Sequence, residues 1–215
     1  MTKGIIFDLD GVLVSTDEYH YLSWVKLSDD EEFAFFDRAF NHKFRGVGRA
    51  KCVEIITAAS GKPYTAGQKG EMAERKNRYF MELLQEVTPA MLLPGSLAML
   101  QELKRRGIRT AIASNSRNAR FIIEHTGIES LLDAIVDGHE IENSKPDPEV
   151  FLLAAQKIEL QPAECLVVED AVAGIEAATR AGMKSLGIGT PDYLTNASMI
   201  VKNLGEISVD ALLAL

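Results

Sequence analysis

Short apolar runs alternate with amphipathic segments in two parts of the chain, its first residues and the part after Pro94. At the start, Ile5, Ile6 and Phe7 form an unbroken apolar run, which is typical of a strand buried on both faces. Similar runs predict strands at 110–113, 134–136, 165–168, 185–188 and 199–201. Helical periodicity predicts helices at 96–106, 117–126, 148–158 and 171–181. Strands that alternate with helices indicate the α/β class with a doubly wound parallel sheet.

The segment from Thr16 to Val87 has a different pattern, with helical periodicity and no convincing strand. It opens with Asp17 and Glu18, which favour the first turn of a helix. We predict helices at 17–27, 30–42, 49–60 and 66–87. Residues 1–15 and 88–215 are therefore expected to form an α/β core domain, and residues 16–87 a helical cap domain inserted after the first strand.

Composition narrows the class of protein further. A chain of 215 residues with 47% hydrophobic content can bury a sizeable core. The formal net charge of -8 argues against general affinity for nucleic acid or for anionic membranes. The two cysteines, Cys52 and Cys165, indicate neither a disulfide framework nor a zinc site. Because the first residues resemble neither a signal peptide nor a membrane span, we expect a cytoplasmic protein.

Polar residues follow the predicted strands at the point where each strand ends. Since the carboxyl ends of parallel strands meet at one edge of a sheet, where α/β proteins bind ligands, these residues are expected to lie together. Alone, each has an ordinary explanation, such as a helix cap or a solvated loop lysine. Their recurrence at one edge predicts a single site made of these residues: Asp8, Asp10, Ser114, Asn115, Ser116, Lys145, Glu169 and Asp170.

The chemistry of this set is restricted by its charge. Carboxylates at close range repel each other by about 4 kcal/mol per pair at an effective dielectric constant of about 20, so they require a cation. Oxygen ligands of this kind favour Mg²⁺. The Ser114 hydroxyl, the amides of the next helix start and the Lys145 ammonium are suitable donors to a phosphate. A carboxylate beside a metal can attack phosphorus, so the set predicts phosphoryl transfer through an aspartyl-phosphate.

Asp8-Leu9-Asp10-Gly11-Val12, followed by Ser114, Lys145-Pro146 and Glu169-Asp170, resembles the four motifs of the haloacid dehalogenase superfamily. Further stretches are similar to the β-phosphoglucomutase family: Thr16-Asp17-Glu18-Tyr19-His20, Gly46-Val47, Arg49, Arg75-Lys76-Asn77, Ser114-Asn115-Ser116, Ser144-Lys145-Pro146 and Gly174-Ile175. That family isomerises β-D-glucose 1-phosphate and glucose 6-phosphate through β-glucose 1,6-bisphosphate. The resemblance implies the same reaction here, sugar phosphates as the only partners, Mg²⁺ as cofactor and a monomer.

The resemblance also implies roles for individual residues. Asp8 would be the nucleophile, Asp10 the general acid and base, and Thr16 the residue that holds Asp10. The metal ligands would be Asp8, Asp10 through its backbone carbonyl, Glu169 and Asp170. Phosphate and substrate would be bound by His20, Gly46, Val47, Arg49, Lys76, Ser114, Asn115, Ser116, Arg117, Asn118 and Lys145. The bond between Lys145 and Pro146 is expected to be cis, as in relatives.

Periodicity supports two of the cap residues independently. Lys76 interrupts an apolar stripe formed by Met72, Phe80 and Leu83, so its charge needs a partner. His20 shares a helix face with Trp24. The ordinary alternatives are a snorkelling lysine and a buried, paired histidine.

The sequence departs from the β-phosphoglucomutase pattern in the cap loop. Arg45 stands where lysine is expected, and Gly48 where serine is expected. Because an arginine fork is not equivalent to an ammonium, these positions bear on the identity of the sugar. A phosphatase of sugar phosphates is therefore the alternative enzyme. A non-catalytic sugar-phosphate-binding protein is a further alternative, and the presence of Asp8, Asp10 and Lys145 argues against it.

Overall fold

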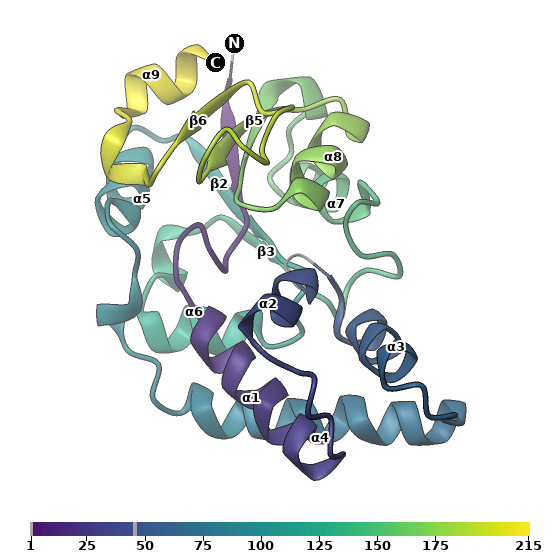
Figure 1. The fold of residues 1–215 in the computed structure, drawn as a ribbon. Helices are drawn as coiled ribbons and strands as arrows, with labels where there is room; N and C mark the ends of the chain where they lie inside the picture. Colours follow the sequence, from purple (N-terminus) through teal and green to yellow (C-terminus); the bar gives the residue numbers. More distant parts are fainter. Residues whose placement is uncertain (1, 45–46) are drawn as a thin grey trace. The chain divides into compact units, whose positions relative to one another are not determined.

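The structure is a computed structural model that describes residues 2–44 and 47–215. It divides into two compact units (Figure 1). The first comprises Met1–Ser15 and Thr88–Leu215, and the second is Thr16–Val87. The α/β fold class predicted from the sequence, with helices inserted after the first strand, is confirmed.

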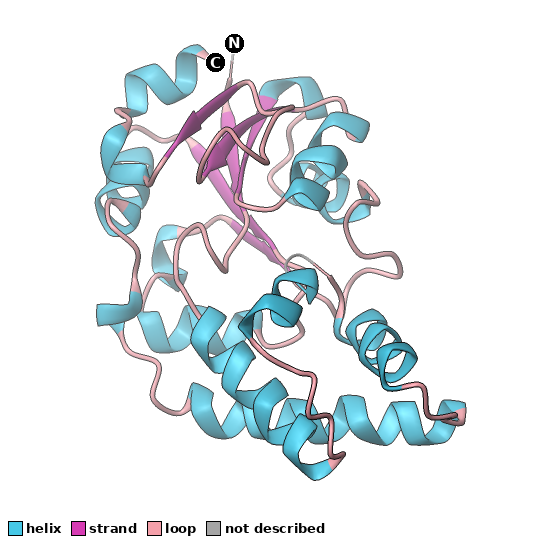
Figure 2. Ribbon diagram, viewed as in Figure 1, coloured by secondary structure: helices cyan, strands magenta, loops and turns pink. Residues whose placement is uncertain are grey.

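The first unit is built on a parallel sheet of six strands in the order β3-β2-β1-β4-β5-β6 (Figure 2). The strands are β1 (Gly4–Phe7), β2 (Arg109–Ala113), β3 (Ala134–Val136), β4 (Cys165–Glu169), β5 (Lys184–Ile188) and β6 (Met199–Val201). All lie where the apolar runs predicted them. The chain winds outward in both directions from β1 and β4, which is the switch point at which such sheets bind ligands.

Helices pack against this sheet and close its core: α5 (Ser96–Arg105), α7 (Glu149–Lys157) and α8 (Val172–Arg180). Helix α6 (Ala119–Thr126) contacts the 3-10 turn at Pro89–Met91, and α9 (Val209–Ala214) packs against α5. Fully buried Ile6 and Val167 of the sheet belong to one apolar cluster with Phe151 of α7. Helix α9 was not predicted from the sequence. Its signal was Ser208, whose hydroxyl accepts a hydrogen bond from the Ala211 amide at 3.2 Å and so caps the first turn.

The second unit is helical, with α1 (Asp17–Asp30), α2 (Arg38–Asn41), α3 (Arg49–Ser60) and α4 (Ala66–Leu84), and a 3-10 turn at His42–Phe44. Its apolar core includes Trp24, Leu27, Phe44, Ile56 and Met72. Helix α4 opens with a reciprocal capping box, in which the side chains of Thr65 and Gln68 each bond the other's backbone amide. Within the described residues, no helix combines the length and apolar composition that crossing a bilayer requires.

The helix predicted at 30–42 is found only in its last part, as α2, and residues 31–37 are not helical. Helix α1 continues to Asp30, and Glu32 then takes a left-handed conformation with φ of 58°. The Phe33 amide turns back to donate to the Ser28 carbonyl at 2.8 Å, which ends the helix. The apolar spacing that favoured a helix in the sequence comes from aromatic side chains that pack on one another: Phe33, Phe35, Phe36, Phe40 and Phe44. The helix predicted at 66–87 also stops earlier, at Leu84.

Candidate active site

Strand register brings the predicted site residues of the first unit to one edge of the sheet. Phe7 at the end of β1 pairs with Ile112 of β2 and with Val168 of β4. The next residues on these strands therefore leave the sheet side by side. Asp8 extends the ladder by donating its amide to the Val168 carbonyl at 2.9 Å, and the Ser114 amide donates to the Val136 carbonyl at 3.0 Å.

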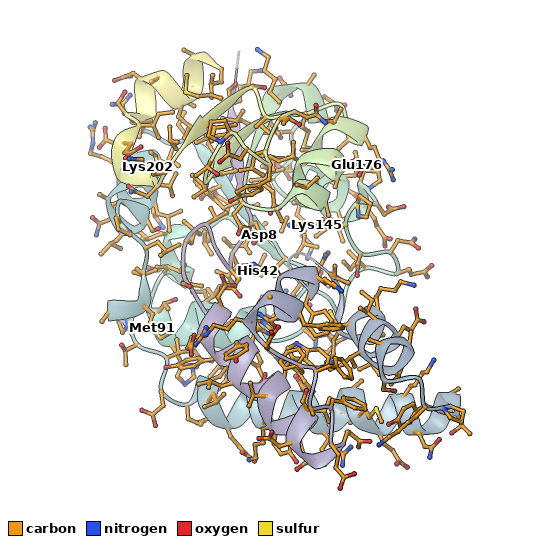
Figure 3. The ribbon with its side chains drawn as sticks, in the orientation of Figure 1. Asp8, His42, Met91, Lys145, Glu176 and Lys202 are labelled. Carbon is orange, nitrogen blue, oxygen red and sulfur yellow. The ribbon has the colours of Figure 1, made fainter. Side chains whose placement is uncertain are left out.

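Lys145 is the centre of this edge, where Figure 3 shows it beside Asp8. Its Nζ donates to Asp8 Oδ1 at 2.5 Å, to Glu169 Oε2 at 2.8 Å and to the Ala113 carbonyl at 3.0 Å. An ammonium has three donor hydrogens, so these contacts account for all of them. Burial alone would lower the pKa of Lys145, but the two carboxylates outweigh it and hold that pKa above its ordinary value.

The Asp8 carboxyl is buried and lies among like charges. Burial raises its pKa to about 7, although the Lys145 ammonium acts in the opposite direction and the charge of Glu169 adds to the rise. A divalent cation beside the carboxylate would lower this pKa strongly, because it stabilises the ionised form. Asp8 therefore lies in a setting that favours the binding of positive charge.

Three carboxylates form a group that fits a metal ion. Asp8, Glu169 and Asp170 each offer an oxygen, and these oxygens lie within 4.8 Å of one another. Glu169 is fixed at both ends, since its Oε1 accepts the backbone amides of Asp170 at 3.1 Å and Ala171 at 3.0 Å while Oε2 contacts Lys145. An all-oxygen donor set of this kind suits Mg²⁺. The fourth predicted ligand, Asp10, is expected to contribute its backbone carbonyl and not its carboxylate, so this carboxylate group does not test it.

Two glycines allow the backbone to approach these carboxylates. A Cβ atom at Gly174 would lie 2.0 Å from Glu169 Oε2, and one at Gly11 would lie 2.3 Å from Asp170 Oδ2. Gly11 also has φ of 86°, a conformation that other residues rarely adopt. Gly11 and Gly174 are therefore required because a side chain at either position would collide with Asp170 or Glu169.

The loop after β2 carries the predicted phosphate-binding residues. Ser114 is buried, and its Oγ accepts the Ser116 amide at 3.2 Å, while Ser116 Oγ accepts the Asn118 amide at 3.2 Å. Asn115 Oδ1 accepts the Lys145 amide at 3.3 Å. The bond between Lys145 and Pro146 is cis, as expected from the resemblance. Ser114, Asn115 and Lys145 are therefore brought together at the sheet edge.

One partner of this loop was missed by sequence reasoning. Gly138, in the turn after β3, donates its amide to the Ser116 carbonyl at 3.2 Å and accepts Arg117 Nε at its carbonyl at 3.2 Å. In the sequence, Asp137-Gly138 indicates only a turn. Because Gly138 makes these contacts through backbone atoms, its residue type does not reveal them.

The helical unit contains its own buried polar pair. Lys76 is 2% exposed on α4, and its Nζ lies 2.8 Å from His20 Nδ1 of α1. Since an ammonium only donates, Nδ1 is the acceptor and the imidazole proton sits on Nε2. The His20 ring stacks on Phe80 at 4.0 Å. Burial, with the charges of Lys76 and Arg49, holds the pKa of His20 well below its usual value. The predicted interruption of an apolar stripe by Lys76 is confirmed.

Two other predicted residues of this unit, Thr16 and Arg49, lie at helix starts. Thr16 is buried at the N-cap of α1, without a side-chain capping hydrogen bond among the residues that the structure describes. Arg49 is the first residue of α3, and the Val47 amide donates to the Phe44 carbonyl at 3.0 Å. Gly46 and Arg45 lie outside the described residues.

The arrangement at the sheet edge agrees with a family profile. The profile of the haloacid dehalogenase-like hydrolases matches residues 2–182. The chain belongs to this family. A β-phosphoglucomutase of Bacillus subtilis (strain 168) is 38% identical over 212 residues, which are 98% of this chain and 93% of that protein. The crystal structure of a β-phosphoglucomutase from Clostridium difficile superposes with a TM-score of 0.92 at 34% identity, covering 99% of this chain and 96% of the other.

The chain also has phosphatase relatives. A phosphorylated carbohydrates phosphatase of Thermotoga maritima is 28% identical over 187 residues, 86% of this chain and 83% of that protein. The chain is thus an enzyme of the haloacid dehalogenase-like family that is similar to both mutases and phosphatases.

Proposed function

We propose that the chain is a β-phosphoglucomutase, which interconverts β-D-glucose 1-phosphate and glucose 6-phosphate through β-glucose 1,6-bisphosphate. The observation that carries this proposal is the buried group of Asp8 and Glu169 around Lys145, with Asp170 beside it. Such a group is suited to phosphoryl transfer through an aspartyl-phosphate on Asp8. The 38% identity with the Bacillus subtilis β-phosphoglucomutase supports the choice of a mutase.

Asp8 is the proposed nucleophile. The hydrogen bond from Lys145 to Oδ1 restrains rotation of the carboxylate, so one defined oxygen can meet the phosphorus atom. Lys145 also fixes Glu169, and the two acids are held in one geometry by one cation. Attack by Asp8 on phosphorus forms an O–P bond and releases the sugar oxygen, which receives a proton from Asp10 in its role as general acid.

Asp8, Glu169 and Asp170 would hold Mg²⁺, with the Asp10 carbonyl as a further proposed ligand. When bound, the ion neutralises charge on the transferring phosphoryl group. Ser114 and Asn115 are the proposed donors to that group, and Lys145 is proposed to bind it through the positive charge held beside Asp8. Ser114 presents a buried hydroxyl for this purpose, and Asn115 lies against the Lys145 backbone.

A mutase, unlike a phosphatase, must also hold the second phosphate of the bisphosphate. Ser116, Arg117 and Asn118 are proposed for this task on the loop after β2. The helical unit is proposed to contribute further substrate contacts and to keep water from the aspartyl-phosphate. Its residues in this proposal are Thr16, which holds Asp10, with His20, Gly46, Val47, Arg49 and Lys76. A cytoplasmic, monomeric enzyme stays a prediction.

The test supplies the purified protein with Mg²⁺, β-glucose 1-phosphate and a trace of bisphosphate, and follows glucose 6-phosphate and free phosphate in the same reaction. The proposal expects glucose 6-phosphate as the main product. Free phosphate as the main product would establish the phosphatase alternative, which the Thermotoga maritima relative favours. If neither product forms, glucose phosphates are not the substrates, and other sugar phosphates would be tested in the same way.

A further inference from the structure

The turn that follows β3 is built on one buried carboxylate. Asp137 is 1% exposed; its Oδ1 accepts the His139 amide at 2.8 Å, and its Oδ2 accepts Arg120 Nε at 2.8 Å. Its backbone carbonyl accepts the Glu140 amide at 3.1 Å. Because both carboxylate oxygens are bonded, Asp137 fixes the path of the chain through Gly138.

Two helices hold the same turn from outside. Arg120 of α6 donates to Glu140 Oε1 at 2.9 Å and to the Ile135 carbonyl at 3.4 Å. Lys157 of α7 donates to the Ile135 carbonyl at 3.1 Å and also contacts Glu140. A turn restrained by several charged hydrogen bonds loses little further freedom when a neighbouring group binds a ligand.

Gly138 passes this restraint to the proposed phosphate loop. Its amide donates to the Ser116 carbonyl, and its carbonyl accepts a hydrogen bond from Arg117 Nε. A Cβ atom at this position would lie 2.3 Å from the Asn115 carbonyl. Among the described residues, Nε makes the side-chain hydrogen bond of Arg117, which leaves its terminal amino groups as the donors for a ligand. An arginine anchored in this way presents a fixed fork to a phosphate.

We propose that Asp137 is a positioning residue for the second phosphate of the substrate. Acting through the turn at Gly138, it sets the places of Ser116 and Arg117, and so it determines how strongly the enzyme prefers a sugar bisphosphate to a ligand without a second phosphate. This inference rests on the proposed function and deepens it. The phosphate that reacts at Asp8 is assigned to Ser114, Asn115 and Lys145, and of these only Asn115 lies against Gly138. The effect of the turn should therefore be larger on the second phosphate than on the first.

The test measures binding of glucose 1,6-bisphosphate and of inorganic phosphate, which carries no second phosphate, by calorimetry in the presence of Mg²⁺, and uses the ratio of the two affinities. Gly138→Ala forces Asn115 and Arg117 to move, and we expect the ratio to fall about tenfold. Asp137→Asn keeps an acceptor for the His139 amide but removes the charge that faces Arg120. For this near-isosteric variant, we expect a fall of about threefold.

The matched control is Arg109→Gln, which breaks an exposed pair with Asp133, 3.3 Å away, at the other end of β2. It should leave the ratio unchanged. Hydrolysis of p-nitrophenyl phosphate, a substrate with no second phosphate, should stay within about twofold of wild type in Asp137→Asn and Arg109→Gln. In Gly138→Ala, which also displaces Asn115, this activity should fall less than binding of the bisphosphate does. An unchanged ratio in both Gly138→Ala and Asp137→Asn would overturn the inference, and so would equal losses toward both ligands.

The inference and the proposed function can fail separately. If the wild-type protein prefers the bisphosphate and the two variants lose that preference, the inference stands even where no glucose 6-phosphate is formed. If the wild-type protein binds both ligands equally, there is no second phosphate site to position, and the inference is overturned.

Discussion

Asp8 and Lys145 are separated by 137 positions in the sequence and form a buried ion pair, with 2.5 Å between Oδ1 and Nζ. The same ammonium also pairs with Glu169, so one buried cation faces two carboxylates. Buried charges are costly unless they are balanced, and here the balance is incomplete. The site therefore has a physical need for additional positive charge, which a divalent ion would supply.

Replacing Lys145 should destabilise the protein strongly. Lys145→Ala leaves Asp8 and Glu169 buried without their partner, and we expect the free energy of unfolding to fall by about 3 to 5 kcal/mol. Urea unfolding followed by circular dichroism measures it, and added Mg²⁺ should restore part of the loss. Lys3→Ala removes an exposed pair with Glu164 and should cost less than about 1 kcal/mol. Equal losses in the two variants would refute this account.

Replacing the nucleophile should abolish turnover without unfolding the protein. Asp8→Asn keeps the shape of the side chain but cannot form the acyl phosphate, so activity should fall more than about a thousandfold. Steady-state kinetics and a circular dichroism spectrum test both parts. Asp210→Asn, at an exposed carboxyl of α9, serves as the control. Activity retained by Asp8→Asn would rule out covalent catalysis by this residue.

Two helical glycines should respond to alanine with opposite signs. Gly174→Ala would place a Cβ 2.0 Å from Glu169 Oε2, so we expect weaker Mg²⁺ binding and a stability loss of about 1 to 3 kcal/mol. Gly70 of α4 has open space around its Cβ position. Gly70→Ala should stabilise the helix by about 0.5 to 1 kcal/mol. Thermal unfolding and magnesium titration distinguish them, and a stabilised Gly174→Ala would contradict the packing described here.

The helical unit should lose stability in mild acid. The pKa of His20 is lowered in the folded state, so the unfolded chain binds more protons below about pH 6.5. Stability contributed by neutral His20 is therefore present near pH 7 and is lost as the pH falls, by up to about 1.4 kcal/mol per pH unit. Trp24, the only tryptophan, reports this unit in fluorescence-monitored unfolding. His20→Gln should show a shallower pH dependence, and identical slopes would argue against this titration.

Arg49 offers a functional prediction for the mutase cycle. If it binds the second phosphate, Arg49→Ala should lower formation of glucose 6-phosphate about tenfold or more, and release of free phosphate much less. Parallel assays of the two products measure this split. Lys51→Ala, two positions further along α3 and exposed, is a suitable control. Equal losses of both activities would count against the role.

The strands and the sheet-edge acids could be predicted because buried parallel strands carry continuous apolar runs that end abruptly. Asp8 and Glu169 stand at such ends, and register alone then brings them together. The ion pairs of Lys145 were not predicted, because they depend on a side-chain conformation that residue type does not specify. Gly138 was missed as a partner of Ser116 and Arg117 because it acts through its backbone.

The error at residues 30–42 has a different cause. Aromatic residues at Phe33, Phe36 and Phe40 repeat with nearly the spacing of a helix, but Phe33 and Phe36 lie in the non-helical segment between α1 and α2. Glu32 takes a positive φ that short-range preferences do not favour for glutamate. Tertiary packing of aromatic rings outweighed local propensity there.

The place of β1 in the sheet has a consequence for the order in which the chain folds. During synthesis β1 emerges first, yet both of its neighbours, β2 and β4, emerge only after the helical unit is complete. That unit is one uninterrupted segment of the chain. The residues that flank it lie together, because Val14 and Leu92 form an isolated antiparallel β-bridge. A helical segment that folds early shortens the effective loop and lowers the entropy cost of closing the sheet. Asp8 thus meets Glu169 only when β4 has been made.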